Sequence, residues 1–216
     1  MPASPPPTGP VLPRHFLLPS GTMVWRVHED RWSSDAFNPS RADPHFGGSR
    51  FDSTPDDPYD FLYLAGSEEA ALSEVLARDL WPNSDGDRLL AYASVAGRCL
   101  SALVTTRELR LVSLRSTLDL AAVGQDEWLV NTDPSHYGQT RAWARWLRQA
   151  SDTAQGLAWQ SNRHRPTSAF VLFGDRCLAG TLAVLHSHTR PLYSPDGIEW
   201  LNDRLRAYRM RVEPPR

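Results

Sequence analysis

The sequence predicts a single α+β domain, and three observations lead to that class. The chain has 216 residues, of which 41% are hydrophobic and 22% charged, values typical of a globular protein with its own core. Apolar stretches of strand length and amphipathic stretches of helical period both occur. They follow one another without the regular strand–helix–strand alternation of a doubly wound parallel sheet, and the chain contains no internal repeat.

The expected elements begin after a proline-rich segment. Residues 1–20 contain seven prolines, which cannot donate backbone hydrogen bonds, so we expect a flexible tail followed by one domain over residues 21–216. A polar loop over residues 38–58 is long enough to suggest a functional role. Strands are expected over residues 22–28, 61–65, 99–106, 109–114, 168–173 and 182–185. Helices are expected from residue 67 to the Trp81-Pro82 pair, over 137–150 and over 198–205.

Charge and composition exclude several classes of function. The net charge is −2, so no basic surface indicates direct nucleic-acid binding. All 23 basic residues are arginines, which excludes both the lysine of a Walker A phosphate loop and Schiff-base catalysis. Any anion site in this chain therefore has to use guanidinium groups, which bind phosphates through paired hydrogen bonds.

Cysteine spacing and hydropathy set further limits. Cys99 and Cys177 lie outside any Cys-x-x-Cys pattern, so we expect no structural zinc site. No apolar run reaches the roughly 18 residues that a membrane span requires, and the N-terminus lacks the pattern of a signal peptide. These observations predict a cytoplasmic protein.

One strand–turn–helix segment carries the most informative pattern. Phe61–Ala65 is apolar and aromatic, as expected of a buried strand, and Ser67 is a good N-cap for the helix that follows. The two acidic residues of the first turn suit the helix dipole, but Glu74 has no such role and lies close to the apolar face. It forms either an ion pair with Arg78, one turn further along, or part of a functional site.

Two arginines precede this segment. Arg26 lies within the strand expected over 22–28, and Arg50 closely follows the pair Gly47-Gly48. Adjacent glycines let the backbone come close to another group, with a guanidinium at hand. The alternatives are that Arg26 pairs with Glu29 or stacks on the neighbouring tryptophan, and that the glycines form only a turn.

The order of these blocks resembles the RES domain family, which is named for an arginine, a glutamate and a serine. The strand arginine comes first, then Gly-Gly-x-Arg, then Tyr63-Leu64-Ala65 with Glu74 on the next helix. Downstream, Ser161 stands where the family carries its serine. The resemblance covers residues 23–173, which is most of the chain.

The resemblance implies an ADP-ribosyltransferase-like fold: a split, mostly antiparallel sheet with flanking helices and a cleft that takes NAD as its substrate. The implied reaction breaks the nicotinamide–ribose bond through an oxocarbenium-like state. Glu74 is the expected carboxylate that stabilises the cation. Tyr63 would stack on nicotinamide or shield the cation, and Ser161 would bind the ribose or phosphate or orient Glu74. Arg26 completes the expected catalytic set.

The same resemblance assigns the NAD-binding residues. They are Arg26, Gly48, Arg50, Tyr63 and Ser161. The arginines would neutralise the pyrophosphate. This chain departs from the family where Ser49 is inserted before Arg50 and Phe51 replaces a tryptophan, which leaves the position of Arg50 open. Arg163 and Arg165 are the alternative phosphate site.

The resemblance also bears on partners. Many members are toxins of toxin–antitoxin pairs, so it implies a helix-turn-helix antitoxin as partner and a reaction without metal. The ADP-ribosyl group could pass to water, to inorganic phosphate or to a specific metabolic acceptor. A RES-like module kept only for binding is a further alternative.

Another alternative is a metal hydrolase built from His186 and His188 with His28, Glu29 and Asp30. A serine hydrolase is disfavoured because no Gly-x-Ser-x-Gly occurs.

Overall fold

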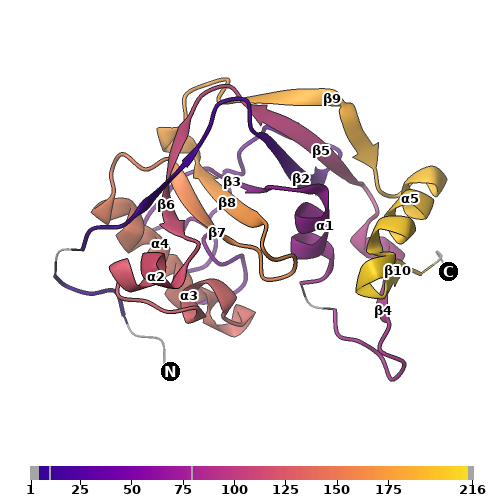
Figure 1. Cartoon of the computed structure of the whole chain (residues 1–216), viewed down its shortest axis with the longest axis horizontal. Coiled ribbons are helices and arrows are strands. Elements are labelled where there is room, and N and C mark those ends of the chain that lie inside the picture. Colours follow the sequence, from indigo (N-terminus) through magenta and orange to yellow (C-terminus); the bar gives the residue numbers. More distant parts are fainter. Residues whose placement is uncertain (1–4, 10, 79, 214–216) are drawn as a thin grey trace.

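The computed structural model describes residues 5–9, 11–78 and 80–213. Within them, eight strands form one curled sheet in the order β1-β6-β7-β8-β3-β2-β5-β9, and two short strands pair separately (Figure 1). The large sheet consists of β1 (His15–Leu18), β2 (Met23–Glu29), β3 (Phe61–Ala65), β5 (Arg98–Thr105), β6 (Leu109–Leu114), β7 (Gly156–Gln160), β8 (Ser168–Phe173) and β9 (Leu182–Pro191). The small pair is β4 (Arg88–Leu90) with β10 (Met210–Val212).

The helices are α1 (Glu68–Leu76), α2 (Thr117–Ala122), α3 (Trp128–Asn131), α4 (Tyr137–Ala150) and α5 (Pro195–Leu205). In Figure 1, α2, α3 and α4 gather at the β6–β7 end of the sheet, α1 lies next to β2, and α5 flanks the opposite end with β4 and β10. Within the large sheet, only β6 and β7 pair in parallel. The predicted α+β fold with a mostly antiparallel sheet is therefore confirmed.

The middle of the sheet is split. β2 pairs with β5 along its whole length, and β3 pairs in the same way with β8. Between β2 and β3, however, the register contains a single pair, Trp25 opposite Ala65. Beyond that pair the two strands diverge, and Asn38 of the long loop bridges to Phe61 in place of β2. Because α1 contacts β2, β3, β5 and β8, it spans the point of divergence.

The core divides on the two sides of this split. One cluster joins α4 to β6, β7 and β8. The helical spacing of Trp143, Trp146, Leu147 and Ala150 predicts an apolar stripe on α4, and Trp143 and Leu147 are fully buried. A second cluster joins α1 to α5 and the small β4–β10 pair. A third packs along the middle strands. The stripe extends less far than expected, because Ala150 at the end of α4 is exposed.

Several predicted bounds need correction. Residues 15–18 of the predicted tail form β1, because they pair with β6 at the sheet edge, and only then does Pro19 follow. Residues 1–4 and 10 of that tail lie outside the described part. The helix after Ser67 ends at Leu76, well before Trp81-Pro82. β9 and α5 are longer than expected, and α5 starts at Pro195 with Ser194 as its cap. The elements β4, β7, β10, α2 and α3 were not predicted from the sequence.

Candidate active site

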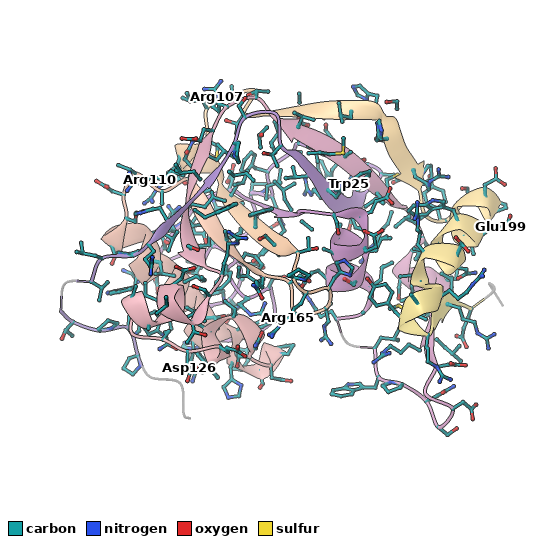
Figure 2. The ribbon with its side chains drawn as sticks, viewed as in Figure 1. Trp25, Arg107, Arg110, Asp126, Arg165 and Glu199 are labelled. Atoms are coloured by element: carbon teal, nitrogen blue, oxygen red, sulfur yellow. The ribbon has the colours of Figure 1, made fainter. Side chains whose placement is uncertain are left out.

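A cleft of about 530 Å³ lies along the split of the sheet. β2 and β3 contribute its walls where they diverge, and α1 contributes one side. Ser49, Arg50 and Asp52 of the long loop and Trp159 of β7 close it. Figure 2 shows Trp25 on β2 next to α1, at the point where the split begins. Four arginines and three carboxylates line the cleft: Arg26, Arg50, Arg78, Arg98, Glu29, Asp52 and Glu74.

Glu74 faces the cleft from the middle of α1. The predicted N-cap is present, since Ser67 accepts a hydrogen bond from the backbone N–H of Ala70 at 3.2 Å. The carboxylate of Glu74 accepts two hydrogen bonds on Oε1, from the Ser161 hydroxyl at 2.6 Å and the Asn162 backbone N–H at 3.0 Å. The alternative ion pair with Arg78 does not occur among the described residues, and that guanidinium donates to Ser49 Oγ at 3.1 Å.

Ser161 holds Glu74 from behind and does not line the cleft. It is fully buried at the turn after β7, where its Oγ also accepts the N–H groups of Arg163 at 3.2 Å and His164 at 3.0 Å. Arg163 ties the same turn to the segment just after α1 by donating to the carbonyl of Arg78 at 2.6 Å. The turn and the helix thus fix one carboxylate oxygen of Glu74 and leave the other side to the cleft.

Tyr63 lines the cleft with its hydroxyl already occupied. The hydroxyl donates to Asp52 Oδ1 at 2.9 Å and accepts the N–H of Phe51 at 3.0 Å. Burial raises the pKa of this hydroxyl well above its ordinary value, and the neighbouring Asp52 charge raises it further. The ring packs edge-on against Trp159, with 6.3 Å between ring centroids. Tyr63 therefore offers a fixed, neutral ring and no mobile proton.

Arg26 lines the cleft and also holds a loop. Its Nη1 donates to the carbonyls of Ser34 at 2.7 Å and Ala36 at 2.8 Å. Burial lowers the pKa of its guanidinium to about 10, so the group stays charged at neutral pH. The alternative pair with Glu29 is not formed among the described residues, since Glu29 pairs with Arg31 at 2.6 Å.

Arg50 reaches the cleft despite the insertion before it. Its Nη2 donates to the carbonyl of Thr132 at 3.3 Å, and its guanidinium carbon lies 5.2 Å from the ring centroid of Tyr137. Burial lowers its pKa, and the charge of Glu74 acts in the opposite direction. Its Nε is buried without a hydrogen-bond partner in the described part of the chain, as is Nε1 of Trp159.

Gly48 lies behind the cleft and does not line it. Its φ is +69°, and a Cβ there would lie 2.8 Å from Ala42 Cβ, 3.0 Å from Asp52 Oδ2 and 3.2 Å from Arg141 Nη1. The close neighbours for which Gly48 leaves room are thus side chains of the protein itself. Arg141 of α4 is buried and donates to four carbonyls of the loop: those of Asp43, Phe46, Gly47 and Ser49.

Sequence reasoning missed Asp52, Arg141, Trp159, Arg78 and Arg98 as parts of this region. Asp52 and Trp159 each lie two residues from a predicted site residue, and Arg78 lies four residues from Glu74, so proximity was a usable signal. Arg98 and Arg141 come from elements distant in the sequence, and no local pattern marks them.

The competing sites are not assembled. His186 and His188 are on the exposed part of β9, and Nε2 of His28 lies 2.9 Å from Ser101 Oγ. Among the described residues, no group of three or more histidine, cysteine, aspartate or glutamate side chains is arranged to hold a metal ion. Arg163 and Arg165, the alternative phosphate site, do not line the cleft.

In the part of the chain that the structure describes, no helix combines the length and the apolarity that crossing a bilayer requires.

The split, mostly antiparallel sheet and the cleft between β2 and β3, in which an anchored carboxylate lies among guanidinium groups, define an α+β protein with a charged cleft. A family model described as "RES domain" matches residues 23–194, and the chain therefore belongs to the RES domain family. A chain in the structure titled "Crystal structure of the M.tuberculosis MbcT-MbcA toxin-antitoxin complex" has a similar fold, with a TM-score of 0.57 and 18% identity. The match covers 81% of this chain and 85% of that one. Among curated proteins no match was found.

Proposed function

We propose that this protein cleaves the nicotinamide–ribose bond of NAD, as an NAD glycohydrolase or NAD phosphorylase that acts in the cytoplasm. The observation that carries the proposal is the anchored carboxylate. Glu74 is held on Oε1 by Ser161 and by the N–H of Asn162, inside a cleft lined by four guanidinium groups. Membership of the RES domain family supports the same chemistry.

The chemistry needs a fixed negative charge more than it needs a proton. Nicotinamide leaves as a neutral group, so the sugar develops positive charge as the bond breaks. A carboxylate that is held in place before the reaction stabilises that charge without reorganising. Glu74 meets this requirement because two donors hold one oxygen and the helix holds the side chain. Tyr63, with its hydroxyl occupied, supplies a ring against nicotinamide or the cation.

The substrate's phosphates match the rest of the cleft. Arg26 and Arg50 supply charge, and both remain partly committed to protein carbonyls, which fixes their positions. Arg78 and Arg98 also line the cleft, so a ligand with two phosphates would meet four guanidinium groups.

We further propose that the protein is the toxin of a toxin–antitoxin pair, restrained by a helix-turn-helix antitoxin. The structurally similar chain comes from a complex whose title describes a toxin and an antitoxin. An enzyme that consumes NAD needs such a restraint. Transfer of ADP-ribose to a metabolic acceptor and a role in binding alone are the outcomes that the following experiment would reveal instead.

The experiment incubates the purified protein with NAD, with and without inorganic phosphate, and identifies the products. Release of nicotinamide with free ADP-ribose indicates hydrolysis, and formation of phosphorylated ADP-ribose indicates phosphorolysis. Glu74→Gln is the matched control, because it keeps the size of the side chain and removes its charge. Unchanged NAD after incubation with the wild-type protein would contradict the proposal.

A further inference from the structure

We propose that Asp52 is a positioning residue for this reaction, one that holds the ring of Tyr63 and the backbone around Arg50 in the geometry that the cleft requires. The inference rests on the proposed function. It goes beyond the proposed function by assigning a role to Asp52. The hydrogen bonds of this carboxylate given below are all made to protein groups, and it acts on the substrate through Tyr63 and Arg50.

The contacts of Asp52 form a closed network. Oδ1 accepts the hydroxyl of Tyr63 at 2.9 Å, and Oδ2 accepts the backbone N–H of Ser49 at 2.7 Å. The hydroxyl of Tyr63 in turn accepts the N–H of Phe51 at 3.0 Å. The residues on both sides of Arg50 are thus tied to the same carboxylate–phenol pair. This explains how Arg50 reaches the cleft although Ser49 has been inserted before it.

The environment of this carboxylate is unfavourable for stability alone. Asp52 is 9% exposed, and none of the ion pairs among the described residues includes it. A buried charge without an ion pair costs free energy, and it persists where a function needs it. An asparagine could accept one of the two hydrogen bonds. Only a carboxylate accepts both, with one oxygen for each.

The network also fixes what Tyr63 contributes. With its proton given to Asp52 and a lone pair given to Phe51, the hydroxyl has no proton to exchange with a substrate. Loss of either partner would remove one of the two hydrogen bonds that orient the ring, which otherwise packs against the core, with the edges of Phe61 and Trp159 at 5.7 and 6.3 Å between centroids. Tyr63→Phe and Asp52→Asn should therefore disturb the same element of the site.

The test is a double-mutant cycle on NAD turnover with Asp52→Asn, Tyr63→Phe and the double variant. Each single variant should lose kcat by about tenfold, as expected for one strong hydrogen bond lost in the site. The double variant should be no slower than the slower single variant, because both substitutions disturb the same Ser49–Asp52–Tyr63–Phe51 network. Asp60→Asn is the control. Asp60 directly precedes β3, pairs with Arg41 at 3.2 Å and does not line the cleft.

A second readout keeps this test separate from that of the proposed function. Amide hydrogen exchange of residues 49–52 should be faster in Asp52→Asn and in Tyr63→Phe than in the wild type, and unchanged in Asp60→Asn. If the wild type leaves NAD intact, the proposed function fails, and faster exchange in both variants would still support the network. Additive losses in the cycle, unchanged kcat in both single variants, or unchanged exchange would each overturn the role of Asp52.

Discussion

At the scale of single residues, the cleft is built from charges that the protein has fixed before any ligand arrives. Glu74 is held by Ser161, Arg26 is held by two carbonyls, and Asp52 is held by Tyr63 and a backbone N–H. Such preorganised charges act on a reacting centre without the cost of reorienting. Their individual contributions can be separated, because most of them also have a structural partner that a substitution can spare.

Substitutions of Arg26 and Arg50 should differ in whether they affect NAD binding alone or stability as well. Arg50→Ala is expected to weaken binding by roughly 1.5–3 kcal/mol, the loss of a charge-assisted hydrogen bond to an anion. Arg26→Ala should weaken binding and also lower stability, because Arg26 holds the carbonyls of Ser34 and Ala36. Calorimetric titration with NAD and thermal unfolding of each variant measure the two effects. Parent-like affinity in both variants would place the phosphate site elsewhere.

The raised pKa of Asp52 predicts that the free energy of unfolding depends on pH. Burial raises its pKa above 3.8, although Tyr63, the Ser49 N–H, Arg141 and Arg78 act in the opposite direction. Between the unfolded and the folded pKa the native state binds more protons than the unfolded state, so this group lowers the free energy of unfolding as the pH rises through that window. Urea unfolding of the wild type and of Asp52→Asn across mildly acidic pH checks this. Relative to the variant, the wild type should lose stability with rising pH, and a gain would show that the shift has the opposite sign.

At the scale of elements, α1 and the turn after β7 act together as one clamp on Glu74. α1 begins at its Ser67 cap, and the turn joins it through Ser161, while Arg163 binds the carbonyl of Arg78 just after the helix. α4 has a comparable role for the loop before β3, because its buried Arg141 binds carbonyls over residues 43–49. α1 thus carries the site carboxylate itself, while α4 positions a loop whose site residues it does not carry.

The N-cap of α1 offers a prediction at this scale. Ser67→Ala should cost about 1 kcal/mol in the free energy of unfolding, since the N–H of Ala70 loses its acceptor. Turnover of the folded protein should stay within a few-fold of the wild type, because Glu74 keeps both donors. Chemical unfolding and NAD turnover of the same preparation test both parts. A large loss of turnover without a loss of stability would show that the cap acts on the site directly.

Local patterns predicted some elements well and could not predict others. The bounds of the helix over 137–150 and the strands over 61–65 and 168–173 were predicted to the residue, because periodicity and turn residues define them locally. β1 was missed because its strand character comes from pairing with β6, while the surrounding prolines indicate a tail. The contact between Glu74 and Ser161 joins residues 87 positions apart, and only the family resemblance brought them together. Arg141 carries no such signal.

At the scale of the whole molecule, the split of the sheet produces the cleft, and the cleft gathers residues from both halves. Because β2 and β3 meet only at Trp25 and Ala65, the space beyond that pair is open to a ligand. Each half of the sheet has its own supporting cluster, with α4 on one side and α1 and α5 on the other. The family assignment and the fold agree with this arrangement.

A cellular prediction follows from an NAD-consuming enzyme without its partner. Induction of the wild-type protein in a bacterial host should slow growth and lower cellular NAD, while Glu74→Gln at equal expression should do neither. Growth curves and extracted NAD, sampled together after induction, measure the effect. Constant NAD with both proteins would contradict the toxin proposal and favour a slow metabolic transfer or a binding role.

The most direct test of the central claim is the rate at which purified wild-type and Glu74→Gln proteins consume NAD. The wild type should release nicotinamide, and the variant should be slower by on the order of 100-fold or more, because it loses the charge that stabilises the reacting sugar. Circular dichroism and the unfolding midpoint should be alike for the two proteins, since the Ser161 hydroxyl and the Asn162 N–H can still donate to the amide oxygen. Near-equal NAD consumption by two well-folded proteins would contradict the assignment of Glu74 as the catalytic carboxylate.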